Sequence, residues 1–168
     1  RKSHIQAIVH SVIRSSDQRI IPKCKYFLEC TGCQYQHLRY SQQLEIKTQR
    51  VQSELNSYKS LSNIKVDNAL PATHPFEYRN HARFTIRKNG KLGFINRVTR
   101  QFIKIDNCLI MHQKINSIIK KIQCKVAETT QMSVRYGVNT DEYLIQPTLQ
   151  NPEIKLQTGQ LHYTDKLN

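Results

Sequence analysis

Three closely spaced cysteines are the feature that most constrains this chain. Cys24, Cys30 and Cys33 follow the spacing C-x5-C-x2-C, and Cys108 comes far downstream. The odd total of five cysteines argues against a closed disulfide framework. In a reducing compartment, cysteines grouped in this way are typical of a metal site. We therefore expect a metal centre that ties the loop at residues 24–33 to the segment around Cys108.

The rest of the sequence is consistent with such a compartment. No apolar run approaches the roughly 20 residues that a membrane span needs. The N-terminal Arg1-Lys2-Ser3-His4 leads into no apolar stretch of the signal-peptide type. We expect a cytoplasmic protein that is a monomer and has no membrane partner.

The charge balance indicates a polyanionic partner. Lys and Arg number 26 against 12 Asp and Glu, which gives a net charge of +14. Basic proteins bind nucleic acids because neutralised phosphates release their condensed counterions. The charge is spread through segments with regular patterns, which favours nucleic acid over a merely solvated basic surface. Composition favours RNA over DNA only weakly.

The cysteine spacing leaves the identity of the metal open. Structural zinc sites usually pair two C-x2-C knuckles, and only Cys30 and Cys33 form one here. Three thiolates in a short loop, with a fourth from a remote segment, are a recurring iron–sulfur arrangement. His37 is a further candidate zinc ligand, although a hydrogen bond beside the site is the simpler role.

Hydrophobic periodicity predicts an α+β fold with an antiparallel sheet. Helical patterns cover residues 40–58 and 111–126, the second with Cys124 near its apolar face. The pair Asn89-Gly90 predicts a hairpin with a type I′ turn, in which both residues need positive φ. Strand patterns cover residues 5–13, 64–66, 81–87, 91–95, 101–105, 133–137 and 142–146.

Two blocks of sequence carry a resemblance to a known family. The first reads Cys24-x5-Cys30-Thr31-Gly32-Cys33-x2-Gln36-His37-x2-Tyr40-x2-Gln43-Leu44-x2-Lys47. The second joins Tyr78-Arg79-Asn80-His81-Ala82-Arg83-Phe84, Gly90-Lys91-Leu92-Gly93-Phe94 and Ile105-Asp106-Asn107-Cys108-Leu109-Ile110. Over about residues 15–165 the chain resembles the iron–sulfur-containing RNA uracil-5-methyltransferases, which form 5-methyluridine in ribosomal or transfer RNA.

The resemblance implies a [4Fe–4S] cluster. Its expected ligands are Cys24, Cys30, Cys33 and Cys108, at the positions that match the family's ligand thiolates. Thr31 stands where the family usually has Gly, which narrows the backbone angles allowed in that turn. With four thiolate ligands no iron stays open for substrate, so we expect a structural role; redox sensing is the alternative.

The resemblance also implies a division of the chain. Residues 1–21 would be the remnant of a linker or preceding domain, and residues 22–63 the cluster loop and its helix. Residues 64–168 would form the central RNA-recognition domain, an antiparallel sheet with flanking helices. In the family a TRAM domain comes earlier and an S-adenosylmethionine domain later, the latter carrying the nucleophilic cysteine and the carboxylate base. Because these residues hold no Gly-rich cofactor loop, we expect S-adenosylmethionine only in the parent protein and no activity from this chain.

The expected contribution of these residues is to bind a single-stranded loop of RNA, ribosomal or transfer. Such loops are read by stacking and by basic groups along the phosphates. We expect Phe84, Phe94 and Phe102 to face the core, with the basic residues on the opposite side of the sheet. The candidate RNA contacts are Arg79, Asn80, Arg83, Arg87, Lys88, Lys91, Arg97 and Arg100. The alternative is a zinc- or iron–sulfur-dependent RNA-binding module with no methyltransferase parent.

Overall fold

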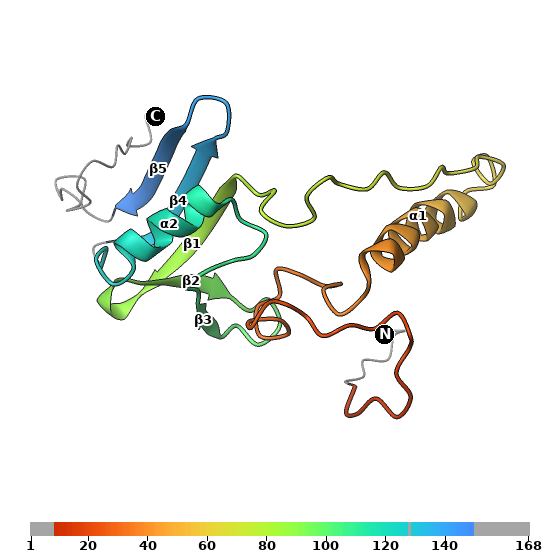
Figure 1. Ribbon diagram of the computed structural model, residues 1–168, viewed down its shortest axis with the longest axis horizontal. Helices are drawn as coiled ribbons and strands as arrows, with labels where there is room; N and C mark the ends of the chain where they lie inside the picture. The colour runs from red at the N-terminus through yellow and green to blue at the C-terminus, as the bar shows by residue number, and fades with distance from the viewer. Residues whose placement is uncertain (1–8, 128, 150–168) are drawn as a thin grey trace.

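The computed structural model describes residues 9–127 and 129–149 and shows an α+β fold (Figure 1). Its five-stranded sheet has the order β3-β2-β1-β4-β5, and all neighbouring strands are antiparallel. This confirms the predicted α+β class and its antiparallel sheet. The elements, in chain order, are α1 (Tyr40–Asn56), β1 (His81–Arg87), β2 (Lys91–Ile95), β3 (Phe102–Lys104), α2 (Gln113–Ile122), β4 (Thr129–Gly137) and β5 (Glu142–Leu149).

The core lies between the sheet and α2. Along β1, Ala82, Phe84 and Ile86 are buried, while the side chains between them point to the other face. The strand therefore shows the period of two that its sequence predicts. Helix α2 covers the buried face of the sheet (Figure 1). It buries one stripe of isoleucines at helical spacing: Ile115, Ile118, Ile119 and Ile122.

The hairpin between β1 and β2 is confirmed, with a longer turn than a type I′ turn provides. Arg87 pairs with Lys91, so three residues, Lys88–Gly90, make the connection. Asn89 has φ 64° and Gly90 has φ 67°, the positive values that the Asn-Gly pair predicts. A Cβ atom on Gly90 would also lie 2.9 Å from the backbone of Cys124 and of Val126. The turn thus packs against the chain that leaves α2.

Replacing Gly90 by alanine should destabilise the fold by about 2 kcal/mol or more. The left-handed conformation costs a residue with a Cβ about 1–2 kcal/mol, and the contact with residues 124–126 adds to this cost. Thermal unfolding followed by circular dichroism measures the change. Lys88→Ala, at an exposed position of the same turn, is the matched control and should change little. An unchanged midpoint for Gly90→Ala would contradict the packing described here.

Several elements differ from the sequence-based prediction, and β4 begins four residues earlier than expected. Residues 9–13 form no strand, and the rest of that predicted strand lies outside the described residues. The second helix ends at Ile122, before Cys124. Cys124 is exposed and adopts φ 64°, and its N–H donates to Gly90 O, so it is not a buried helical residue. Residues 64–66 are extended but belong to no strand.

That extended segment pairs with side chains of α1 instead of a strand. Gln52 Nε2 donates to Ile64 O and Gln52 Oε1 accepts from Val66 N–H, both at 2.9 Å. Farther along, Ala69 N–H donates to Thr48 Oγ1 at 2.9 Å. The segment therefore runs back along α1. Every residue of α1 stays at least partly exposed, and the helix projects away from the sheet (Figure 1).

Within the described ranges, the helices are all too short or too polar to cross a membrane.

Candidate nucleic-acid interface beside a cysteine-lined cavity

The four cysteines expected to act as ligands surround one cavity of about 30 Å³, called here the thiol cavity. Cys24, Cys30 and Cys33 come from the irregular loop before α1, and Cys108 comes from the segment between β3 and α2. Short-range turns shape the loop, since Phe27 N–H donates to Cys24 O and Cys30 N–H donates to Tyr26 O. Apolar side chains make up much of the remaining wall: Phe27, Phe94, Ile105, Leu109 and Ile110.

The other side of the thiol cavity is held by a buried asparagine. Asn116 of α2 accepts from Cys108 N–H at 2.9 Å and donates to Cys108 O at 3.0 Å. Its amide also donates to Met111 O. Because the N–H and the carbonyl of Cys108 are both bound to a side chain of the core helix, the core fixes the backbone from which its thiol extends. The sequence analysis did not predict this role of Asn116. The pattern that could have indicated it is a polar residue among the buried isoleucines of α2.

The loop is attached to the sheet by contacts that require no metal. Tyr26 OH donates to Asp106 Oδ2 at 3.1 Å and accepts from Asp106 N–H at 3.0 Å. Asn96 Nδ2 donates to Glu29 O at 2.7 Å. Thr31 Oγ1 accepts from Arg97 N–H at 3.0 Å, and φ of Thr31 is not positive. A threonine therefore fits the turn without strain and adds a link to the sheet.

The thiols influence one another electrostatically. Burial is the main cause that raises the pKa of both Cys30 and Cys108, and the charges of Cys33 and Cys24 raise both pKa values further. The N–H of Gly32 opposes this effect at Cys30. The raised pKa values favour the neutral thiols of Cys30 and Cys108, and a bound cation would compensate the charge of the thiolates. Four sulfur donors with an apolar surround therefore suit a thiolate-bound metal group.

No three His, Cys, Asp or Glu side chains among residues 9–127 and 129–149 form a group arranged to hold a single metal ion.

A second and larger concavity, called here the basic cleft, lies on the sheet next to the cysteine loop. Its volume is about 560 Å³, and the loop segment Cys30–Gly32 forms one side of it. The cleft exists because β1 pairs with β2 only from Thr85 to Arg87, whereas β1 pairs with β4 from His81 to Thr85. The first half of β1 thus has no partner on its β2 side. Four predicted RNA contacts line the cleft: Arg79, Asn80, Arg83 and Arg97.

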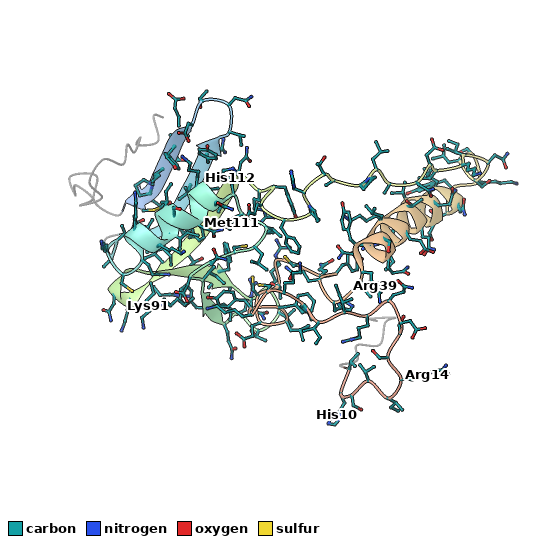
Figure 2. All side chains as sticks on the ribbon, viewed as in Figure 1. His10, Arg14, Arg39, Lys91, Met111 and His112 are labelled. Carbon is teal, nitrogen blue, oxygen red and sulfur yellow. The ribbon has the colours of Figure 1, made fainter. Side chains whose placement is uncertain are left out.

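The other four predicted contacts are not part of this group. Arg87, Lys88 and Lys91 lie at the β1–β2 turn, and Figure 2 shows Lys91 at the end of the sheet remote from the cysteine loop. Arg100 lies in the connection between β2 and β3 with φ 62°. All four are exposed, but none lines the basic cleft.

Two residues that sequence reasoning missed belong beside the cleft. His81 lines it and pairs with Arg135 of β4, which is directly opposite on the sheet. Burial lowers the pKa of His81, and the charges of Arg135 and Arg79 lower it further. Arg83 donates a hydrogen bond to Gln131, also on β4. Arg135 lies between Val134 and Tyr136, which are both buried. This alternation in β4 could have indicated that Arg135 faces outward.

Arg79 connects the two sites. It lines both the thiol cavity and the basic cleft, and its charge opposes part of the rise that burial causes in the pKa of Cys30. The backbone of Arg79 is fixed on both sides, because its N–H donates to Ile110 O and its carbonyl accepts from His112 N–H. Figure 2 shows His112 at the beginning of α2, next to Met111. The guanidinium is therefore placed where it can act on thiolates and on a ligand in the cleft.

Comparisons with known proteins identify relatives in sequence, although no protein-family model matches the chain. An uncharacterized RNA methyltransferase of Aquifex aeolicus is 30% identical over 167 residues, covering 90% of this chain and 39% of that protein. One from Staphylococcus aureus strain COL is 31% identical over 148 residues, covering 77% of this chain and 33% of that protein. The chain thus spans between a third and two fifths of the length of these relatives.

A solved structure shares the fold. The tRNA (uracil-54, C5)-methyltransferase of Pyrococcus abyssi, crystallised with S-adenosyl-L-homocysteine, superposes with a TM-score of 0.56 and 20% identity. The match covers 88% of this chain and 35% of that one. The chain described here is therefore similar in sequence to one part of proteins named RNA methyltransferases, and similar in fold to one part of a tRNA methyltransferase.

Proposed function

We propose that these residues are the iron–sulfur and RNA-recognition portion of an S-adenosylmethionine-dependent RNA (uracil-5-)-methyltransferase. The observation that carries the proposal is that three thiols of one loop and the remote thiol of Cys108 line one cavity, next to a basic cleft. The names of the relatives support the methyltransferase parent. The net charge of +14 supports a nucleic-acid substrate. The substrate would be a uridine in a single-stranded loop of ribosomal or transfer RNA.

In this proposal the thiol cavity holds a [4Fe–4S] cluster through Cys24, Cys30, Cys33 and Cys108. A cubane distributes four thiolates over four irons, so its ligand sulfurs do not have to converge on a single ion. Bound there, a cluster supplies a covalent link between the loop and the segment before α2. The attachments of the loop at Asp106, Asn96 and Arg97, which need no metal, already hold the loop beside this segment. The role of the cluster is structural.

The basic cleft is the proposed site of RNA contact. Arg83 and Arg97 present guanidinium groups, which bind phosphates through paired charge-assisted hydrogen bonds and stack on bases. Asn80 can both donate to and accept from a base edge. The lowered pKa of His81 favours its neutral form, and its flat ring can stack on a base. The cleft therefore combines phosphate binding with surfaces that suit an unpaired base.

The methyl donor and the groups that react with uracil are proposed to belong to other parts of the enzyme. The sequence of these residues holds no Gly-rich cofactor loop. Exposed Cys124 lies in the connection between α2 and β4, outside both cavities. Incubation of the 168-residue chain with RNA and a labelled methyl donor should give background incorporation; transfer above background would overturn this division of roles.

Metal analysis tests whether the four cysteines hold an iron–sulfur cluster. Chain purified without oxygen should be brown, with close to four irons and four inorganic sulfides per molecule, as a [4Fe–4S] cluster requires. Ultraviolet–visible absorption and elemental analysis measure this. A colourless protein with one equivalent of zinc would instead support a zinc-dependent RNA-binding module. Protein with neither metal after anaerobic reconstitution would overturn both readings.

A further inference from the structure

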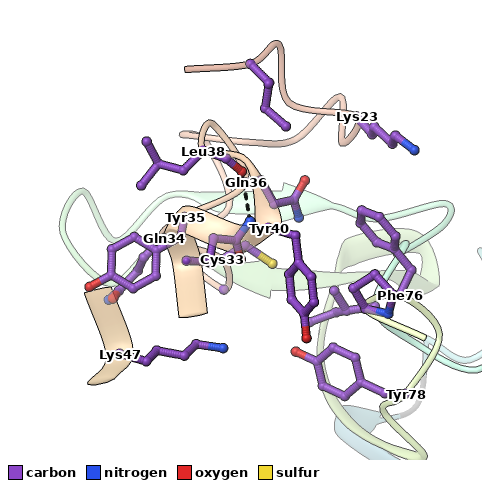
Figure 3. Close-up of a pocket in the computed structure, with 15 residues that line it drawn as sticks. Lys23, Cys33, Gln34, Tyr35, Gln36, Leu38, Tyr40, Lys47, Phe76 and Tyr78 are labelled. Atoms are coloured by element: carbon purple, nitrogen blue, oxygen red, sulfur yellow. Dashed lines mark hydrogen bonds between the residues drawn. The ribbon is translucent and has the colours of Figure 1, made fainter. Parts of the chain in front are cut away.

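A third cavity, of about 490 Å³, lies on the α1 side of the cysteine loop (Figure 3). It is formed by the loop, the beginning of α1 and the chain before β1, and it shares only Gly32 with the lining of the basic cleft. We call it the aromatic cavity because four rings line it: Tyr35, Tyr40, Phe76 and Tyr78. Figure 3 shows Tyr40, Phe76 and Tyr78 along one side, and Tyr35 with Lys47 along the other.

Two of the rings are fixed by hydrogen bonds at their hydroxyl ends. Tyr40 OH accepts from Ala72 N–H at 2.8 Å, and Tyr35 OH accepts from Arg50 Nη1 at 2.8 Å. Their positions therefore do not depend on a ligand. Tyr78 differs, since the residue is 62% exposed. A large ring left in solvent at the edge of a cavity is available for stacking on a planar ligand.

Two lysines and one amide oxygen of the aromatic cavity have no ion-pair or hydrogen-bond partner among the described residues. Lys23 and Lys47 take part in no ion pair among the described residues, although Lys23 Nζ lies 5.4 Å from the centre of the Phe76 ring. The Oε1 atom of Gln36 is buried and, in the part of the chain that the structure describes, receives no hydrogen bond. Buried acceptors without a donor are rare and call for a ligand or a water. Gln36 lines this cavity and the thiol cavity.

We propose that the aromatic cavity binds one base of a single-stranded RNA whose neighbouring phosphates contact Lys23 and Lys47. A cavity lined by aromatic rings and two lysines suits a base on a charged backbone better than it suits a peptide side chain. The base would stack on Tyr78 and donate an N–H from its edge to Gln36 Oε1. The inference rests on the proposed RNA recognition and extends it. Because both RNA sites border the cysteine loop, one RNA strand would cross that loop.

A fluorescent base tests this inference directly. A single-stranded RNA of about ten nucleotides carries 2-aminopurine at one position, varied along a set of oligonucleotides. Stacking on tyrosine should quench the fluorescence for one position when the wild-type chain is added. Tyr78→Ala should abolish this quenching and weaken binding about 5- to 150-fold, the usual effect of losing one base–aromatic stack. Tyr78→Phe, which keeps the ring, should preserve both.

Control variants separate the possible failures. Tyr58→Ala removes another exposed tyrosine, outside the cavity, and should leave binding unchanged. Lys47→Gln should reduce the salt dependence of binding by about 0.7 in log–log slope. If the wild-type chain binds no RNA, the proposed function itself fails. If RNA binds but no position is quenched and Tyr78→Ala binds like wild type, only the assignment of the aromatic cavity is overturned.

Discussion

Replacing Cys108 by serine is expected to lower thermal stability and RNA affinity together. Cys108 is the only proposed ligand outside the loop, and core residue Asn116 fixes its backbone. Loss of this thiolate would release the loop from the sheet on one side. Losing a structural metal link costs several kcal/mol, and each kcal/mol shifts the midpoint of a chain of this size by about 2–4 °C. A fall of about 10 °C is therefore expected.

The affinity for RNA should fall because the loop forms a wall of the basic cleft. Cys30–Gly32 border that cleft, and Arg79 lines it together with the thiol cavity. We expect binding to weaken about tenfold, equivalent to about 1.4 kcal/mol. The core between the sheet and α2 contains none of the ligands except partly buried Cys108 at its edge. The far-ultraviolet circular dichroism of the variant should therefore remain that of a folded protein.

The matched control is Cys124→Ser. This cysteine is exposed and lines neither the thiol cavity nor the basic cleft, so iron content, midpoint and affinity should stay at wild-type values. Full iron content in Cys108→Ser would remove Cys108 from the ligand set. A Cys108→Ser chain that loses its iron but keeps its stability and RNA affinity would contradict a structural role and favour redox sensing.

The local parts of the fold could be predicted from sequence because their signals are local. The alternation in residues 81–87 and the isoleucine spacing of α2 each report a buried face directly. The Asn89-Gly90 pair reports a turn through its positive φ values. Phe84 and Phe94 stack on each other with ring centres 5.3 Å apart, as expected for core residues.

The non-local parts could not be predicted. Phe102 pairs with Ile95, which puts it on the opposite face from Phe94 and outside the core cluster. That register depends on the length of the connection between β2 and β3, and a shift of one residue reverses every side chain. The basic cleft likewise depends on β4 pairing with the first half of β1. No local sequence pattern indicates that two strands so far apart in sequence are neighbours in the sheet.

This non-local geometry decides which arginines should matter for RNA. Arg83 and Arg87 are both exposed residues of β1 on the same face of the sheet, and sequence reasoning treated them as equivalent. Only Arg83 lines the basic cleft, whereas Arg87 stands beside the turn. We expect Arg83→Gln to weaken RNA binding about tenfold or more, because a charge-assisted hydrogen bond contributes about 1.5–3 kcal/mol. Arg87→Gln should bind like wild type.

Salt dependence gives a second measurement of the same difference. Each lost phosphate contact should reduce the slope of log affinity against log salt by about 0.7 for a single strand. Arg83→Gln combined with Arg97→Gln should therefore flatten the slope by about 1.4 if both residues contact phosphates. Fluorescence anisotropy with labelled RNA at several salt concentrations measures both quantities. The Arg83→Gln variant and the double variant should both unfold at nearly the wild-type temperature, because Arg83 and Arg97 are exposed.

The comparison of Arg83 with Arg87 can also fail in an informative way. If both single variants lose the same affinity, the RNA is attracted by the whole basic face of the sheet, and the cleft has no special part. If Arg87→Gln alone weakens binding, the RNA lies at the β1–β2 turn, with Lys88 and Lys91 as its neighbours. A selective loss in Arg83→Gln would instead mean that the break in pairing between β1 and β2, beside the cysteine loop, creates the site.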